Sequence, residues 1–434
     1  DLSTAKGYHP FYFINDEFLY ETTEPRDLLP YALSDEWVGY CKSNISRKEA
    51  YGFVFESPDM EKLYDGIAGG KSFTMPPTLR NNNMAKYFAR SKDIEGLAYL
   101  LFAGVASQFY GSEGDGWEVP TGDEQRMDSL IKSGLQAYAH AKKDFIRARY
   151  AYQLTRLAFY NNHLADCLRY YEMVKNNPSA GLLRNLSLSF KAGALLKMGK
   201  KKEAAYHYSL AFSRSTLRRR SNYISFSQCG GRLNQENRRD CLAFCKSDEE
   251  RANLLGLFAL GSNVPETDAL QKIYKLYSRS EMLEILAIRE INKIEDNYFS
   301  PSLDKQKGGK KLYMDDWYNE DIDKFTSTWR QEAVVLAGYY HNIAQNPAVP
   351  NKALFETGAA YLSYITRQYD NANAYLDKAA VLPGTQKIKD QQAMTRLLVT
   401  INQRTTIDSS FEAILLPSVQ WLEKKARQEG KNVT

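Results

Sequence analysis

One stretch in the middle of the chain places small and large apolar residues at helical spacing on both sides of a glycine turn. In residues 185–214, Leu188, Ala192 and Leu195 fall on one face of a first helix, and Gly199 with three following lysines interrupts the pattern. The apolar positions then resume at Ala204, Ala205, Tyr208, Ala211 and Phe212. Because apolar residues three and four positions apart share a helical face, the stretch predicts an antiparallel helix hairpin.

The same arrangement occurs elsewhere in the chain. Residues 150–178 repeat it, and Cys167 stands 37 positions before the equivalent Ala204. A third hairpin is predicted between residues 354 and 383, where Ala372 follows Ala204 by 168 positions. A weaker match at Gly96 precedes Cys167 by 71 positions. These intervals are close to one, five and two periods of about 34 residues. We therefore predict an all-α chain built from repeated hairpins.

The best-defined hairpin resembles a tetratricopeptide (TPR) repeat, in which small residues let two helices approach and an aromatic ring fills the gap between neighbouring hairpins. Ala192 and Ala204 match the small positions, Gly199 the turn and Tyr208 the aromatic position. The resemblance implies a TPR-like α-solenoid with an irregular N-terminal segment and long loops. The alternative is ordinary helix packing without repeats. TPR positions are packing positions, so the resemblance implies a concave face but no particular ligand.

Composition divides the rest of the chain into segments. Residues 1–75 are predicted to hold an aromatic-rich N-terminal segment and a first helix, and residues 76–300 a helical-repeat array with its clearest units at 147–215. A mobile insertion is predicted at residues 301–327, followed by C-terminal helical repeats and a cap at 328–434.

A basic cluster follows the best-defined repeat. The chain has 57 basic and 52 acidic residues, so its net charge of +5 gives no general attraction to nucleic acid or membrane. Cations at the C-terminal end of a helix compensate its dipole, which is the structural interpretation of this cluster. The functional interpretation is an acidic protein partner. The arginines of the cluster are Arg214, Arg218, Arg219 and Arg220.

Three aromatic residues in polar loops are further candidates for partner binding. Trp117 lies in the glycine-rich stretch of residues 111–123, and Trp317 and Tyr318 separate a basic from an acidic run. A large ring in a polar loop is available to a protein or a glycan.

No catalytic, cofactor or metal motif is predicted. The segment DGIAGGKSF at 65–73 lacks the glycine spacing of a phosphate-binding loop, and a helix-capping glycine explains it. Cys241 and Cys245 share a helical face without a second pair of ligands, and free buried thiols are expected instead. The acidic residues of 315–323 are interpreted as a solvated loop. We expect each of the five histidines to be structural: His9, His140, His163, His207 and His341.

These features predict a non-enzymatic protein-interaction scaffold in a cell-envelope or secretion-related assembly. The alternative is a glycan-binding surface lipoprotein, from a looser likeness to the starch-utilisation binding proteins of Bacteroidetes. The aromatic N-terminal strip and the segment YAYQLTRLAFY also resemble uncharacterised envelope proteins of that phylum. No apolar run is long enough to span a membrane. A first residue other than Met, Asp1, indicates a removed leader or a fragment. We expect an exported, periplasmic or outer-membrane-associated protein, with a cytoplasmic location left open.

Overall fold

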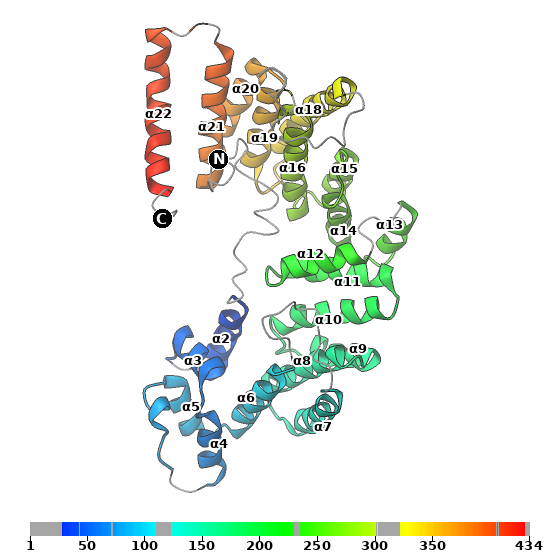
Figure 1. Ribbon diagram of the computed structural model, residues 1–434, viewed down its shortest axis with the longest axis vertical. Coiled ribbons are helices and arrows are strands. Elements are labelled where there is room, and N and C mark those ends of the chain that lie inside the picture. Colours follow the sequence, from blue (N-terminus) through cyan, green and yellow to red (C-terminus); the bar gives the residue numbers. More distant parts are fainter. Residues whose placement is uncertain are drawn as a thin grey trace. The chain divides into compact units, whose positions relative to one another are not determined.

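The computed structural model describes residues 28–42, 44–70, 73–109, 123–229, 235–300, 302, 322–404, 406 and 408–429. Within these ranges every regular element is a helix and no strand occurs, so the predicted all-α class is confirmed. Consecutive helices pack against each other in chain order, as in a solenoid (Figure 1). The chain forms two compact units. We call them the N-terminal unit, described between residues 28 and 245, and the C-terminal unit, described between 246 and 429.

In its described residues the N-terminal unit consists of helices that are 8 to 17 residues long. Its helices are α2 (Leu28–Cys41), α3 (Arg47–Glu56), α4 (Met60–Ala68), α5 (Asn83–Ser91), α6 (Ile94–Ser107), α7 (Glu124–His140), α8 (Asp144–Tyr160), α9 (Leu164–Lys175), α10 (Leu183–Lys197), α11 (Lys201–Arg214), α12 (Arg219–Gln228) and α13 (Gln235–Leu242), with a 3₁₀ turn at Pro77–Leu79. Residues 28–68 form three helices, where the sequence predicted a first helix only.

The C-terminal unit is also helical throughout its described part. Its elements are α14 (Asp248–Leu260), α15 (Thr267–Leu276), α16 (Glu281–Ile294), a π-helix η3 (Glu295–Phe299), α18 (Ile322–Gln345), α19 (Lys352–Ile365), α20 (Tyr369–Ala380), α21 (Gln386–Gln403) and α22 (Ser409–Glu429). The two units divide after Cys245, inside residues 76–300, for which the sequence predicted one array.

The hairpins predicted from the apolar pattern are present. They are α8 with α9, α10 with α11, and α19 with α20, and the helices within each pair pack closely. Gly199 has a φ of +78° at the turn between α10 and α11, a conformation that glycine adopts without steric cost. Ala192, Ala204 and Tyr208 are buried between the helices, as their positions predicted.

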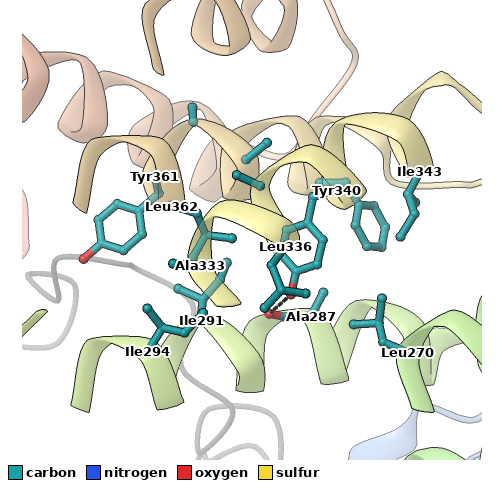
Figure 2. Packing of buried hydrophobic residues seen from close by; sticks show 14 of the residues in the cluster. Leu270, Ala287, Ile291, Ile294, Ala333, Leu336, Tyr340, Ile343, Tyr361 and Leu362 are labelled. Carbon is teal, nitrogen blue, oxygen red and sulfur yellow. Dashed lines mark hydrogen bonds between the residues drawn. The ribbon is translucent and has the colours of Figure 1, made fainter. Parts of the chain in front are cut away.

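The core of the C-terminal unit forms where α16, α18 and α19 meet. Figure 2 shows Ile291 and Ala287 of α16 packed against Leu336 and Tyr340 of α18. The Tyr340 hydroxyl donates a hydrogen bond of 2.8 Å to the Ala287 carbonyl oxygen. The buried ring therefore keeps a partner for its hydroxyl, as a buried tyrosine requires.

Two further sequence interpretations are confirmed. Helix α4 ends at Ala68 with Gly69 as its C-cap, and Gly70 follows with a φ of +65°, so the glycine-rich segment is a helix end. All five cysteines are buried free thiols. Burial raises the pKa of Cys167 to about 12, which leaves its thiol protonated and unreactive near neutral pH.

Candidate functional site

A cluster of aromatic rings joins α8 to α10. Tyr152, Phe159 and Tyr160 occur at i, i+7 and i+8 on α8, so they point to one side of that helix. Phe190 of α10 lies among them, with ring centroids 6.1 Å from Tyr152, 5.5 Å from Phe159 and 6.1 Å from Tyr160. These separations are those of tilted and edge-on aromatic pairs, which stabilise the contact beyond the burial of their area.

Gly193 allows the two helices to approach at this point. A Cβ atom at Gly193 would lie 2.7 Å from Cε2 of Phe159 and 3.2 Å from the Tyr208 hydroxyl oxygen. A real Cβ is not tolerated that close to a ring, so only glycine lets Phe159 lie flat over α10. The aromatic cluster therefore depends on a backbone position as well as on its rings.

Three cations lie over these rings. The Lys197 Nζ is 4.5 Å from the centroid of Phe159, the Arg218 Cζ is 5.5 Å from that of Phe190, and the Arg156 Cζ is 5.5 Å from that of Tyr152. The negative face of an aromatic ring attracts a cation at such distances by about 0.5–1 kcal/mol at exposed sites. We define the basic–aromatic face by these residues: Tyr152, Arg156, Phe159, Tyr160, Phe190, Lys197 and Arg218.

Two of the three cations of this face are not paired with an acidic side chain of the described residues. In the described residues, neither Lys197 nor Arg218 has a carboxylate partner. Partial burial lowers the pKa of Lys197, because desolvation disfavours its charged form. Aromatic rings stabilise these cations only weakly, so the positive charges of Lys197 and Arg218 can still attract an anionic group of another molecule.

The predicted arginine cluster is divided between two helices, which corrects its structural interpretation. Arg214 is the last residue of α11, where a cation compensates the helix dipole as predicted. Arg218 is the N-cap of α12, and Arg219 and Arg220 form its first turn, which contains no acidic residue. At the N-terminal end the dipole is positive, so these three cations add to it instead of compensating it. The compensation argument is therefore wrong for Arg218, Arg219 and Arg220.

The backbone conformation of Arg218 and a hydrogen bond between α10 and α12 bring the N-terminal end of α12 to the aromatic cluster. Arg218 adopts a left-handed φ of +61°, which turns the chain sharply from α11 into α12. The Ser189 hydroxyl of α10 donates a hydrogen bond of 2.8 Å to Oδ1 of Asn222, which holds α12 beside α10. Arg219 lies 5.2 Å from the ring centroid of Phe212, so it too is backed by an aromatic side chain.

The other predicted site residues cannot be placed. Trp117, Trp317 and Tyr318 lie outside the residues that the structure describes. The sequence prediction also missed Phe159, Phe190 and Lys197. The sequence signal for these residues is an aromatic side chain or a lysine that recurs at helical spacing about one repeat apart. Ordinary helix packing produces the same pattern, so the signal does not distinguish a binding face from a core.

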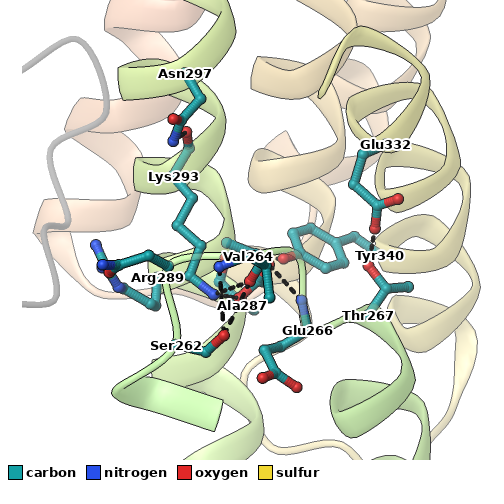
Figure 3. A network of polar contacts seen from close by, with 12 residues as sticks. Ser262, Val264, Glu266, Thr267, Ala287, Arg289, Lys293, Asn297, Glu332 and Tyr340 are labelled. Atoms are coloured by element: carbon teal, nitrogen blue, oxygen red, sulfur yellow. Dashed lines mark hydrogen bonds and ion pairs between the residues drawn. The ribbon is translucent and has the colours of Figure 1, made fainter. Parts of the chain in front are cut away.

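The C-terminal unit contains two polar clusters, of which the first is buried and the second is half-buried. The Lys293 Nζ lies 2.5 Å from Oε1 of Glu290 and donates to the Val264 carbonyl oxygen at 2.9 Å, as Figure 3 shows for Lys293 and Val264. Both side chains are at most 2% exposed. Burial raises the pKa of Glu290 and lowers that of Lys293, since desolvation penalises both charged forms. This cluster fastens the turn between α14 and α15 to α16.

The second cluster involves His341, which the sequence predicted to be structural. His341 Nδ1 of α18 lies 2.8 Å and 3.0 Å from the two carboxylate oxygens of Glu356 on α19. Lys378 of α20 approaches the other side of the ring, with Nζ 3.4 Å from Nε2. The sequence did not indicate the contact with Glu356, because the two residues belong to different helices and meet only when α18 packs on α19.

Neither cluster has the composition of a metal centre, since the described residues contain no group of three or more side chains able to hold a metal ion. Of the described helices, none is both long and apolar enough to cross a membrane. Comparisons of the chain with models of protein families, with curated proteins and with solved structures found no match.

Proposed function

We propose that this protein is a non-enzymatic scaffold that binds an acidic segment of a partner protein on its basic–aromatic face. The observation that carries the proposal is that Lys197 and Arg218 lie over rings of one aromatic cluster without carboxylate partners in the described residues. Tyr and Arg are the side chains that contribute most to protein interfaces, and carboxylates would complement this charge.

The physical form of the face favours an extended or helical segment over a small molecule. Its residues come from the alternate helices α8 and α10 and from the N-cap of α12, so they recur along the chain about once per hairpin. Successive repeats present equivalent positions at regular intervals, which suits a chain that itself has a regular spacing. TPR-like recognition is part of the proposal and is supported by the hairpins, the small residues at their contacts and the glycine turn.

The cellular setting is proposed from sequence resemblance alone. We propose that the scaffold is a subunit of an assembly in the cell envelope, in an exported or outer-membrane-associated form. The acidic partner would then be another protein of that assembly.

The test is chemical cross-linking in the host cells, followed by pull-down of the tagged full-length protein and mass spectrometry. The wild-type chain is compared with Lys197→Glu/Arg218→Glu and with a control of equal charge change elsewhere on the N-terminal unit, Lys86→Glu/Lys132→Glu. We expect one or a few stoichiometric partners, recovered with the control and reduced at least tenfold with the first variant. A synthetic acidic segment of the partner should bind more weakly as salt rises.

Equal recovery with both charge-reversed variants would overturn the assignment to this face. Recovery of the protein alone, without any partner, would overturn the scaffold itself. Unchanged far-ultraviolet circular dichroism of both variants ensures that a loss of partner reports the face and not unfolding.

A further inference from the structure

A second exposed feature lies on the first hairpin of the N-terminal unit, away from the residues of the basic–aromatic face in the sequence. Tyr31 and Phe55 are 39% and 43% exposed, although large aromatic side chains are usually covered. Tyr51 lies between them, with ring centroids 5.0 Å from Tyr31 and 5.4 Å from Phe55. The three rings therefore form a row in which neighbouring ring planes are tilted by 32° and 45°.

The register of α2 and α3 extends this surface by a polar pair. Asp35 follows Tyr31 by four residues on α2, and Arg47 precedes Tyr51 by four on α3, so each pair shares a helical face. The Arg47 Nε lies 2.7 Å from Oδ1 of Asp35, and the two side chains are 59% and 46% exposed. We define the α2–α3 stripe by these residues: Tyr31, Asp35, Arg47, Tyr51 and Phe55.

The polar end of the stripe is open to a ligand. The ion pair uses Nε of Arg47 and Oδ1 of Asp35, so within the described residues the two terminal nitrogens of the guanidinium and Oδ2 of the carboxylate stay available. Gly39 is one further turn along α2, where an added Cβ would meet nothing within 4 Å. No side chain of α2 therefore covers the pair from that direction.

We propose that the α2–α3 stripe binds a neutral saccharide. A guanidinium only donates hydrogen bonds and a carboxylate only accepts them, whereas a hydroxyl does both. Two neighbouring hydroxyls of a sugar would therefore accept from Arg47 and donate to Asp35 at once. The apolar face of the sugar ring, which carries only C–H groups, would lie on Tyr31, Tyr51 and Phe55.

A protein partner fits this surface less well. Protein interfaces of standard size bury about 800 Å² on each partner around a fully desolvated centre. The stripe consists of five side chains, and the same hairpin also carries three exposed charged residues, Lys42, Lys48 and Glu56. A ligand that combines a small apolar face with many hydroxyls matches a short aromatic row that ends in a charged pair.

The experiment is isothermal titration calorimetry of the full chain with a panel of neutral hexasaccharides: cellohexaose, xylohexaose, mannohexaose and maltohexaose. We expect binding to at least one of them, weakened at least tenfold by Phe55→Ala and by Arg47→Gln. Tyr31→Phe keeps the ring and should bind as the wild type does. Phe244→Ala is the matched control, because Phe244 is 40% exposed in the same unit and its ring stacks on Tyr206, outside the α2–α3 stripe.

Absence of binding to every member of the panel would overturn the proposal. So would equal binding by Phe55→Ala, or an equal loss in Phe244→Ala. Capture of a protein through these rings, lost in Phe55→Ala while no sugar binds, would assign the stripe to the other class of ligand. The variant Lys197→Glu/Arg218→Glu should bind the saccharide normally, so this test fails or succeeds independently of the proposed scaffold function.

Discussion

The two units of the protein place their cations in opposite surroundings. In the N-terminal unit, the exposed Lys197 lies over the half-buried ring of Phe159 and the half-buried Arg218 lies over the buried ring of Phe190. Neither cation has a carboxylate partner in the described residues. In the C-terminal unit, Lys293 lies inside the helix packing against Glu290, and Lys378 approaches the His341–Glu356 cluster. A cation whose partner is already supplied cannot attract an outside anion, so we locate binding in the N-terminal unit.

The N-terminal unit also contains a buried cation, and this cation, unlike Lys197 and Arg218, is paired with a carboxylate of the same chain. Arg149 of α8 is 2% exposed, and its Nη2 lies 2.8 Å from Oε2 of Glu36. The other oxygen of Glu36 accepts from the Leu182 amide at 2.9 Å. Glu36 thus fastens α2 to α8 and to the turn before α10, a structural use that leaves no charge available.

The largest expected effect comes from removing one member of the buried pair. Lys293→Met should destabilise the C-terminal unit by about 3–5 kcal/mol, because Glu290 then stays buried without its cation. The same replacement in the other unit, Lys197→Met, should change stability by no more than about 0.5 kcal/mol, since its side chain is at the surface. Native-state hydrogen exchange of amides in α16 and α10 measures the two effects separately.

A double replacement distinguishes burial of an uncompensated charge from loss of packing. Glu290→Met/Lys293→Met should recover most of the stability lost in Lys293→Met, although the amide of Glu266 loses its acceptor. If the double variant is as unstable as the single one, the charges are not what distinguishes the two units.

The next effect concerns the glycine under the aromatic cluster. Gly193→Ala should cost about 1–3 kcal/mol, the usual effect of overpacking, because the new methyl group displaces the Phe159 ring. It should also weaken partner binding, since Lys197 lies over that ring. Gly104→Ala is the control: it is also in a helix, a Cβ there would meet nothing within 4 Å, and it should stabilise the protein slightly. Equal stability of the two variants by urea unfolding would contradict the close approach of α8 and α10.

The sequence predicted the hairpins well because their physical causes are local. Small residues at helical spacing on both sides of a turn require two close helices, and Gly199 supplies the turn wherever the rest of the chain lies. The arginine cluster was harder to interpret. Residues 215–217, between α11 and α12, contain no glycine or proline, so nothing in the pattern showed that Arg218 begins a new helix.

The candidate site was predicted only in part, because its remaining members depend on contacts between helices. Phe159 and Phe190 are 31 residues apart, and each has the spacing of an ordinary core residue. His341 and Glu356 are 15 residues apart on separate helices. The short loop from α18 to α19 makes them neighbours, and only a known packing of the two helices reveals the pair.

The smallest expected effect concerns one glutamate in each unit. The contributions of Glu356 and Glu49 to the free energy of unfolding should change with pH in opposite directions. Burial raises the pKa of Glu356 in the C-terminal unit, and the nearby His341 and Lys378 oppose this only in part. Stability from this group is therefore greatest below the unfolded-state pKa and falls as pH rises toward the folded-state value. Hydrogen bonds from Ser46 lower the pKa of Glu49 in the N-terminal unit, so its contribution is present above the unfolded-state pKa and falls as pH drops.

Urea unfolding of Glu356→Gln and Glu49→Gln between pH 3 and 7 measures both contributions against the wild type. As pH rises, Glu356→Gln should gain stability relative to the wild-type chain, because it avoids ionising a buried carboxyl group. Over the same range Glu49→Gln should lose relative stability, because glutamine accepts the hydrogen bonds of the α3 capping box without the negative charge that strengthens them in the wild type. Parallel slopes for the two variants would contradict the opposite pKa shifts of Glu356 and Glu49 and would show that these two carboxylates experience similar surroundings.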